Sequence, residues 1–219
     1  MDLTRIFEFF DPAKVQGKVH IIGCGAVGST LAENLARAGI DNFVLYDPDR
    51  VESKNVVNQM FAAADIGQLK VDAVERIIKS INPDASVRKR PSGWNGEAVS
   101  GYVFMCPDSI EVRQRIARTI KDSPFVKGVF DFRTALTSAQ HFAADWSDKD
   151  QREAFISSMD FSGEEVQEVT SACGETLGVA PTVRVIVAYG VANFMNFFKG
   201  EPLKKVIVAD AFGFNTVAF

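Results

Sequence analysis

Residues 19–49 have the sequence VHIIGCGAVGSTLAENLARAGIDNFVLYDPD. The β-branched run at 19–23 stops at a glycine, which is typical of a buried parallel strand. Residues 26–38 place apolar side chains three and four positions apart, as on one face of a helix, and Gly39 follows where that helix should end. A second expected strand at 43–47 ends on a carboxylate. This order predicts a strand–helix–strand unit with a parallel sheet and a right-handed crossover.

The turn between the first strand and the helix contains the motif G-x-G-x-x-G at Gly23, Gly25 and Gly28. Gly23 permits a tight turn, Gly25 and the adjoining Ala26 let the backbone approach a phosphate, and Gly28 lets the helix pack closely on the sheet. Free N–H groups at the start of the helix favour an anion there. Asp47, at the end of the next strand, is placed to bind ribose hydroxyls. The unit predicts a site for the phosphates of an adenine nucleotide, but it does not distinguish NAD from ATP.

Strands and helices continue to alternate along the chain. By the same criteria we expect two further helices at 68–81 and 109–121 and two further strands at 101–105 and 125–130. We also expect a candidate strand at 134–144 and a long apolar helix at 178–198. The chain closes with VIVADAF and TVAF on either side of Gly-Phe-Asn, which predicts a hairpin. The sequence therefore predicts an α/β, Rossmann-like fold. Its sheet is mostly parallel, helices cover both faces, and the C-terminal part adds antiparallel strands.

The chain has 219 residues, of which 47% are hydrophobic, enough for one substantial core and too few for two large domains. We expect a single domain with an N-terminal arm at 1–18 and a nucleotide-binding half at 19–133. The remaining half, 134–219, contains a polar segment at 147–172 that we expect to be mobile.

Composition excludes several classes of protein. The net charge of -4 argues against a nucleic-acid-binding protein, and the short basic run at 88–90 is expected to be a solvated strand end. Cys24, Cys106 and Cys173 form no CxxC pair, so neither a zinc ribbon nor a disulfide framework is expected. No signal peptide and no apolar run of about 20 residues is present, which predicts a cytoplasmic protein with no membrane span.

Residues 47–70, DPDRVESKNVVNQMFAAADIGQLK, carry a family resemblance. They resemble the adenylyltransferases that activate ubiquitin-like and sulfur-carrier proteins, that is, the ThiF/MoeB type and the ubiquitin-activating enzymes. The pattern of that family is matched at Asp47, Asp49, Val51, Asn55, Gln59, Phe61, Gly67 and Lys70. A second family signature is matched in CPDSIEVRQRI by Asp108, Ser109 and Arg113. The resemblance is dense over 19–115 and rests on few residues elsewhere.

The resemblance implies that the chain uses ATP and Mg²⁺ to convert a carboxylate into an acyl-adenylate. It makes Asp108 the Mg²⁺ ligand, and an oxygen donor suits that ion. It places Lys70 at the phosphates and Asn55 and Gln59 at phosphate and ribose-side groups, and it puts Asp49 and Asn58 among the nucleotide-binding residues. An exposed helix cap at Asp108 and an ordinary surface lysine at position 70 are the structural alternatives.

The resemblance also implies a partner and an assembly. The partner would be a small ubiquitin-like or sulfur-carrier protein with a C-terminal glycine, bound with dimer contacts by residues 134–219. Arg5 corresponds to an arm that dimers of the family insert into the neighbouring active site, which predicts a homodimer. Cys173 falls on the thiol position of the family, where it would receive the acyl group, although an inert cysteine is the alternative. Cys24, Cys106, His20 and His141 are expected to be packing residues.

One position departs from the family pattern, which has arginine where this chain has Asn58. A cation at the γ-phosphate can contribute several powers of ten in rate. Either Arg5, Arg50 or Lys54 compensates, or the protein is a slow member. The absence of CxxC pairs implies that the structural zinc of many relatives is missing.

Four functions therefore remain open from the sequence. The first is adenylation of a carrier protein. The second is the same chemistry on a small molecule, a peptide or a tRNA base. The third is a catalytically weak partner subunit of this fold, and the fourth is an NAD-dependent dehydrogenase, which would need neither the loop of Asn55 and Gln59 nor the distal Lys70.

Overall fold

The computed structural model of the chain describes residues 1–162, 169–171 and 176–219. The first half contains the strands β1 (Lys18–Ile22), β2 (Asn42–Tyr46), β3 (Ser86–Arg90) and β4 (Gly101–Met105), with the helices α1 (Ala26–Arg37), α2 (Lys70–Ile81) and α3 (Ile110–Ile120). Short 3-10 turns lie at Pro12–Lys14, Ser53–Val57 and Ala63–Asp65. The second half contains β5 (Val126–Thr134), β6 (Ser138–Asp145), α4 (Lys149–Ser157), α5 (Ala180–Lys199), β7 (Val206–Asp210) and β8 (Asn215–Ala218).

One sheet holds the strands in the order β3-β2-β1-β4-β5-β6-β7-β8. The first five strands of this order are parallel, and each pairing from β5 to β8 is antiparallel. The predicted mixed α/β fold is thereby confirmed. The direction in which the strand order grows reverses between β1 and β4, and ligands of such sheets bind at the carboxyl ends of the strands beside this point.

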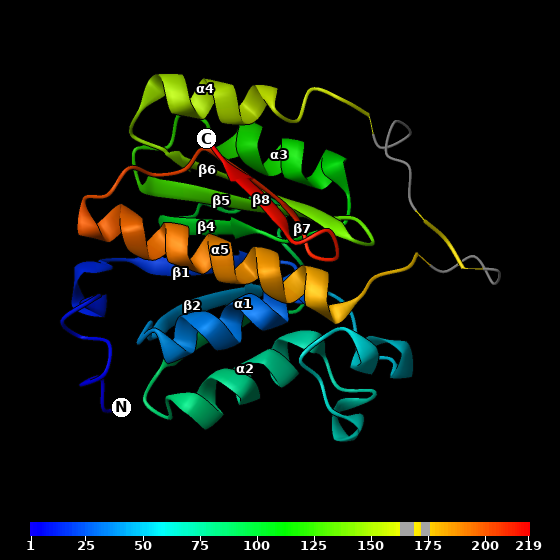
Figure 1. Cartoon of the computed structure of the whole chain (residues 1–219). Helices are drawn as coiled ribbons and strands as arrows, with labels where there is room; N and C mark the ends of the chain where they lie inside the picture. The colour runs from blue at the N-terminus through cyan, green and yellow to red at the C-terminus, as the bar shows by residue number, and fades with distance from the viewer. Residues whose placement is uncertain (163–168, 172–175) are drawn as a thin grey trace.

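Helices cover both faces of the sheet (Figure 1). The helices α1, α2 and α5 lie on one face, and α3 and α4 lie on the other. Successive strand residues point to opposite faces, so Ile21 belongs to the first core and Ile22 to the second. The first core is strongly aromatic. There the Phe194 ring packs edge-on against Phe104 and Phe130, with centroid distances of 5.2 Å in both pairs. These two cores fix the strand ends that carry the site.

Two segments differ in part from what the sequence predicts. The basic run at 88–90 forms the end of the edge strand β3, as expected, but Lys89 is only partly solvated because it is paired with Asp72 and Glu75 of α2. The polar segment expected to be mobile begins with the helix α4. Phe155 of that helix is buried, because its ring packs edge-on against Trp146. Residues 163–168 and 172 of the segment lie outside the described residues.

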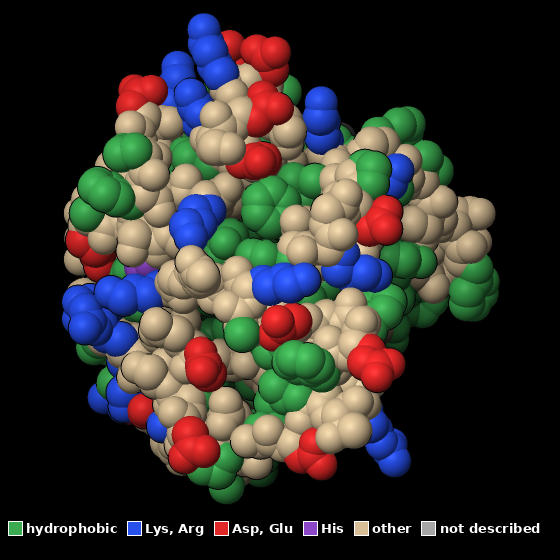
Figure 2. Space-filling view, turned by 90° about the vertical axis from the view of Figure 1, so that its left-hand side faces the viewer, with side chains coloured by type: hydrophobic (Ala, Val, Ile, Leu, Met, Phe, Trp, Pro, Cys, Tyr) green, Lys and Arg blue, Asp and Glu red, His purple; other side chains and the backbone are tan. Residues whose placement is uncertain are grey.

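The N-terminal arm lies at the amino ends of the strands, opposite the site. Its Phe10 is buried against Phe198, and its Phe9 ring lies under the ammonium group of Lys199 at 3.6 Å. Figure 2 faces this side of the molecule and shows basic, acidic and apolar side chains all present across it. Among the helices of the described residues, none has the length and apolar character needed to cross a membrane.

Candidate functional site

A cavity of about 400 Å³ opens at the carboxyl ends of β1, β2 and β4, beside the switch in strand order. It is lined by the turn after β1, the end of β2, the start of α2, the loop after β3 and the turn after β4. Its lining residues are Ile22, Gly23, Gly25, Tyr46, Asp47, Pro48, Asp49, Lys70, Ser92, Gly93, Trp94, Asn95, Cys106, Pro107, Asp108, Ser109, Val112 and Arg115. We call it the nucleotide cavity.

The three positions of the turn are occupied by glycine for different structural reasons. Gly23 has φ +94°, and a Cβ atom there would lie 2.6 Å from the carbonyl oxygen of Cys106. A Cβ atom at Gly28 would lie 1.9 Å from the carbonyl oxygen of Gly23. At Gly25 a Cβ atom would meet nothing within 4 Å. Two glycines are therefore required by packing, whereas Gly25 leaves open space above the turn, where a phosphate would lie.

The start of α1 faces this space. Gly25 is its N-cap residue and supplies no side-chain hydrogen bond, so α1, which begins at Ala26, presents its first N–H groups to the cavity. Asp47 holds the turn in place, because it accepts hydrogen bonds from the N–H of Cys24 at 2.6 Å and of Asp49 at 2.9 Å. Burial raises the pKa of the Asp47 carboxyl, and these two hydrogen bonds oppose that shift. The expected contact of Asp47 with a ribose stays a prediction.

Lys70, the first residue of α2, carries the cation at the edge of the nucleotide cavity. Its ammonium group donates to Asp49 at 2.8 Å. Burial by itself lowers the pKa of Lys70, but the hydrogen bond to Asp49 and the charges of Asp47, Asp49 and Asp108 outweigh burial and raise the pKa. Lys70 is therefore a charged cation at neutral pH, placed where the resemblance puts a phosphate ligand.

The loop between β2 and α2 carries three predicted nucleotide-binding residues whose side chains lie outside the nucleotide cavity. Asn55 is buried and accepts a hydrogen bond from the N–H of Glu52 at 2.8 Å, which caps the short 3-10 turn. The amide group of Asn58 donates to the carbonyl oxygen of Gly178 at 3.2 Å, just before α5. The side-chain oxygen of Gln59 is buried without a hydrogen-bond partner among the described residues. None of these three residues lines the nucleotide cavity, so their predicted contacts with ATP remain predictions.

Two predicted site residues lie away from this cavity or outside the described structure. Arg5 is exposed on the arm at the amino ends of the strands, so within one chain it is distant from the cavity. Cys173 lies outside the described residues. Cys24 and Cys106 are buried, and burial raises the pKa of both thiols, which agrees with their expected packing role.

Sequence reasoning missed one cation of the nucleotide cavity. Arg115 lines it from α3, and its guanidinium lies 5.9 Å from the centre of the Trp94 ring. Arg50 and Lys54, two of the three cations offered as a replacement for the arginine that Asn58 lacks, are not among the lining residues of the nucleotide cavity. Arg115 could have been found from its position on the first two turns of a helix that begins just after Asp108.

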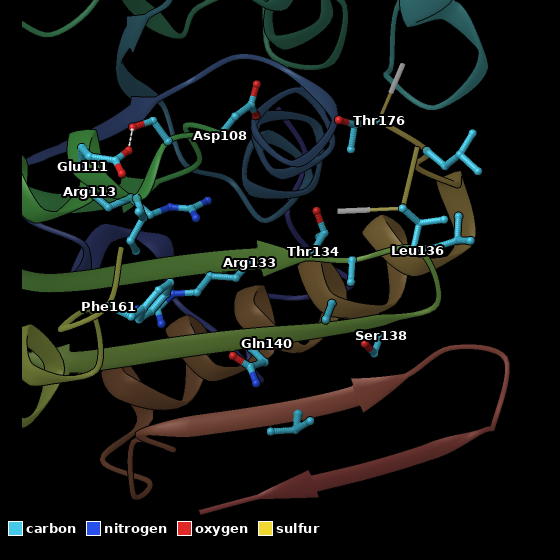
Figure 3. A pocket seen from close by; sticks show the side chains of 17 residues that line it. Asp108, Glu111, Arg113, Arg133, Thr134, Leu136, Ser138, Gln140, Phe161 and Thr176 are labelled. Carbon is cyan, nitrogen blue, oxygen red and sulfur yellow. Dashed lines mark hydrogen bonds between the residues drawn. The ribbon is translucent and has the colours of Figure 1, made fainter. Parts of the chain in front are cut away.

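A second cavity, of about 610 Å³, adjoins the first on the side of β5 and β6 (Figure 3). Asp108 and Ser109 line both cavities. Ser109 is the N-cap of α3, and its hydroxyl accepts a hydrogen bond from the N–H of Val112. The helix is therefore capped by Ser109 and not by Asp108, whose carboxylate is exposed. The walls of this second cavity are largely apolar, with Ile110, Ala135, Leu136, Ala139, Phe161, Val169, Leu177 and Val208.

Two arginines reach the second cavity over one buried carboxylate. The Nε atom of Arg113 lies 3.1 Å from Asp131, and the Nε atom of Arg133 lies 2.7 Å from the other oxygen of the same carboxylate. Asp131 itself is fully buried. The cluster therefore has one more positive than negative charge.

Within residues 1–162, 169–171 and 176–219, no metal centre is built from protein ligands alone, because no three His, Cys, Asp or Glu side chains are gathered so that they could hold a metal ion. Among the described residues, Asp108 would therefore hold an ion only together with ligands from a bound substrate or from water.

The ThiF family matches residues 13–216 of this chain. Ubiquitin-like modifier-activating enzyme 5 of Rattus norvegicus is 46% identical over 85 residues, which cover 38% of this chain and 21% of that protein. The enzyme of the same name from Culex quinquefasciatus is 29% identical over 119 residues, covering 46% and 30% of the two chains.

Among solved structures, Escherichia coli MccB with MccA-N7isoAsn is similar with a TM-score of 0.73 at 18% identity, over 95% of this chain and 66% of that one. PaaA is similar with a TM-score of 0.72 at 18% identity, over 95% and 65%. The matched part is thus less than a third of these curated relatives and about two thirds of the solved structures. The structural likenesses agree with the Rossmann-like fold, and the match over nearly the whole sequence shows that this chain belongs to the ThiF family.

Proposed function

We propose that the chain is an ATP-dependent adenylyltransferase that joins AMP to the terminal carboxylate of a substrate. The observation that carries this proposal is the meeting of the two cavities at Asp108 and Ser109. One cavity has the features of a phosphate site, and the other has apolar walls and a cationic floor. A transfer between two substrates requires two sites that share an edge.

The nucleotide cavity suits a triphosphate better than a nicotinamide cofactor. The start of α1 and the open space at Gly25 would receive phosphate oxygens. Lys70 and Arg115 add two cations to the same cavity. Cations of this kind stabilise the negative charge that develops when pyrophosphate leaves. A dinucleotide carries no third phosphate for them to bind.

Asp108 fits the expected Mg²⁺ ion. Mg²⁺ in nucleotide sites is bound by one or two carboxylates together with substrate phosphates and water, and Asp108 is an exposed carboxylate between the two cavities. When bound, the ion neutralises phosphate charge during the transfer.

The proposed step is a displacement at phosphorus. An oxygen of the substrate carboxylate forms a bond to the α-phosphorus of ATP, while the bond from that phosphorus to the bridging oxygen breaks. The bridging oxygen keeps the electron pair and leaves as pyrophosphate. Here Lys70 and the α1 N-terminus position the phosphates, and the second cavity holds the carboxylate in line with them.

The substrate that we favour is a small ubiquitin-like or sulfur-carrier protein with a C-terminal glycine. Curated relatives are named as activating enzymes for ubiquitin-like modifiers. A short substrate is the alternative, since a structural relative, E. coli MccB, has been solved with ATP and with MccA. In both cases a homodimer that supplies Arg5 to the neighbouring site, and transfer of the acyl group to Cys173, are further parts of the proposal.

The test is pyrophosphate exchange into ATP in the presence of a panel of carrier proteins ending in glycine and of short peptides. We expect exchange with one class of substrate and its loss in Asp108→Ala. Asp122→Ala, an acidic surface change after α3, serves as the matched control. Exchange that persists undiminished in Asp108→Ala would refute the role of this carboxylate. ATP binding without exchange by any substrate would favour the catalytically weak subunit.

A further inference from the structure

The nucleotide cavity extends across the strand ends from one face of the sheet to the other. Lys70 lies at the start of α2, which covers the same face as α1, whereas Arg115 belongs to α3 on the opposite face (Figure 1). Between them the cavity passes the end of β2 at Asp47. In the proposed function the phosphates lie at α1 and Lys70 and the ribose lies at Asp47, so the base is left on the side of α3.

A fixed aromatic ring forms part of the cavity on this side. Trp94, in the loop between β3 and β4, is buried in the second core and also lines the cavity. Its indole Nε1 atom donates to the carbonyl oxygen of Glu97 at 3.2 Å. The Glu97 carboxylate accepts in turn from the N–H of Asn95 at 2.8 Å. The ring is therefore held by its own loop before any ligand binds.

Arg115 lies over this ring. The central carbon of its guanidinium is 5.9 Å from the ring centroid, and its Nη2 atom donates to the carbonyl oxygen of Trp94 at 3.5 Å. Within the part of the chain that the structure describes, Arg115 forms no ion pair. It is exposed where it lines the cavity. One side of the guanidinium is thus directed to Trp94, and the other side is available to a ligand.

A guanidinium that rests on an aromatic ring is a suitable surface for a nucleobase. Bases stack on the planes of arginine and of aromatic side chains, and the contact is tolerant because every base has a flat face. The attraction between the cation and the ring beneath it keeps the guanidinium in place. Val112, one turn earlier on α3, adds an apolar side chain to the same part of the cavity.

We infer that Arg115, held over Trp94, is the surface on which the base of the bound nucleotide stacks. The pair would make the cavity prefer a nucleoside triphosphate over phosphate groups alone. The charge of Arg115 still adds to the positive potential of the cavity, while its planar group contacts the base. This inference rests on the proposed function, because it needs the phosphates at the glycine turn and at Lys70.

The distinguishing property is the dependence of binding on the base. The full chain is titrated by calorimetry with ATP and with inorganic tripolyphosphate, each in the presence of magnesium chloride. Arg115→Ala should weaken ATP binding about tenfold, as expected when a stacking side chain is removed. The affinity for tripolyphosphate should stay within about twofold, because salt screens a charge on the far side of the cavity.

Two further variants separate stacking from charge. Arg115→Lys keeps the charge but has no planar group, so it should lose nearly as much ATP affinity as Arg115→Ala. Arg118→Ala, an exposed change on the same helix and outside the cavity, is the matched control. Equal losses for ATP and tripolyphosphate in Arg115→Ala would make Arg115 a phosphate ligand and overturn the inference. Wild-type ATP affinity in Arg115→Ala or in Arg115→Lys would overturn it as well.

The emission of Trp94 gives a second measurement. The chain has two tryptophans, and Trp146 is buried against Phe155 and does not line the nucleotide cavity. In Trp146→Phe, ATP should change the fluorescence of Trp94 and tripolyphosphate should not. An equal response to both ligands would contradict a base on this side of the cavity. The wild type serves for the same titration if this variant does not fold.

The outcome is separable from that of the proposed function. Ligand binding is measured without turnover, whereas the function is tested by pyrophosphate exchange. Base-dependent ATP binding with no exchange would retain the role of Arg115 and count against adenylation. Exchange with an unchanged KM for ATP in Arg115→Ala would reject that role and leave the function standing.

Discussion

The ammonium group of Lys70 lies 2.8 Å from the carboxylate of Asp49, and only 11% of the lysine side chain is exposed compared with 62% of the aspartate side chain. The cation is therefore fixed by the fold, while its partner is free to move into solvent. Because the pKa of Lys70 is raised, the charge is present before any ligand arrives. In the proposed function, an arriving phosphate would only have to replace Asp49 as the partner of Lys70 or bind beside it, and it would not have to order a flexible lysine.

We predict that Lys70→Met weakens ATP binding by roughly ten- to a hundredfold, the loss expected for one charge-assisted hydrogen bond. Calorimetric titration with ATP checks this. Lys89→Met is the control, because Lys89 also pairs with carboxylates but lies on β3 and does not line the nucleotide cavity. Equal ATP affinity in the wild type and Lys70→Met would refute the phosphate role of Lys70.

Two alanine substitutions in the same turn should have opposite effects. Gly28→Ala forces a Cβ atom to within 1.9 Å of a backbone oxygen and should destabilise the fold by several kcal/mol. Gly25→Ala meets no atom within 4 Å and should change stability by less than about 1 kcal/mol. Gly25→Ala should nevertheless weaken ATP binding, because its methyl group enters the space of the phosphates. Chemical denaturation and ATP titration of both variants separate the two roles.

Acid should destabilise the protein through its two histidines. Burial lowers the pKa of His20 and of His141 from 6.5 to about 4. Between these values the unfolded chain binds a proton at each position and the folded chain does not. Stability should therefore fall as the pH drops from about 6.5 towards 4, by up to about 1.4 kcal/mol per pH unit for each histidine. The free energy of unfolding of His20→Asn, measured at several pH values, should show a shallower slope than that of the wild type.

Asp131→Asn should destabilise the fold by about 3–5 kcal/mol, because it leaves two largely covered guanidinium groups without their shared carboxylate. Asp72→Asn removes a carboxylate from a partly exposed pair with Lys89 at the sheet edge and should cost less than about 1 kcal/mol. Urea unfolding of both variants measures the difference. If the two variants were equally stable, Asp131 would not be the anchor of the second cavity.

The fold was largely predictable because its strands and helices are strongly patterned. The β-branched run before Gly23 and the apolar spacing of α1 and α2 require no tertiary information. The strand β3 was harder, since SVRKR lies at the sheet edge and has no buried apolar alternation. The helix α4 was also missed, because only Phe155 among its residues is buried and its polar composition resembles a loop.

Part of the candidate site was likewise predictable from the sequence, and part was not. Gly25 was found from the spacing of the glycine motif, whereas Lys70 and Asp108 were found from the family resemblance, and all three line the nucleotide cavity. The cluster of Arg113, Asp131 and Arg133 could not be found as a unit. Its members come from α3 and from β5, and only the pairing of β5 beside β4 brings them together. The nucleotide-binding roles of Asn55, Asn58 and Gln59 stay predictions. Asn55 and Asn58 make hydrogen bonds to the backbone of loops, and none of the three lines the nucleotide cavity.

The close approach of Gly23 to the peptide of Cys106 has a consequence for how such a protein can diversify. The glycine turn, which is the proposed phosphate site, packs directly against the turn that carries Asp108. Because the two turns are in contact, neither can shift without the other. In the proposed reaction, the nucleotide side would thus be fixed by the parallel part of the sheet. The second cavity, the proposed acceptor side, is lined by the start of α3 and the end of β5, but also by β6, β7 and the chain beyond Thr134. Substitutions in these later segments would change the proposed acceptor site and leave the glycine turn and Asp108 in place.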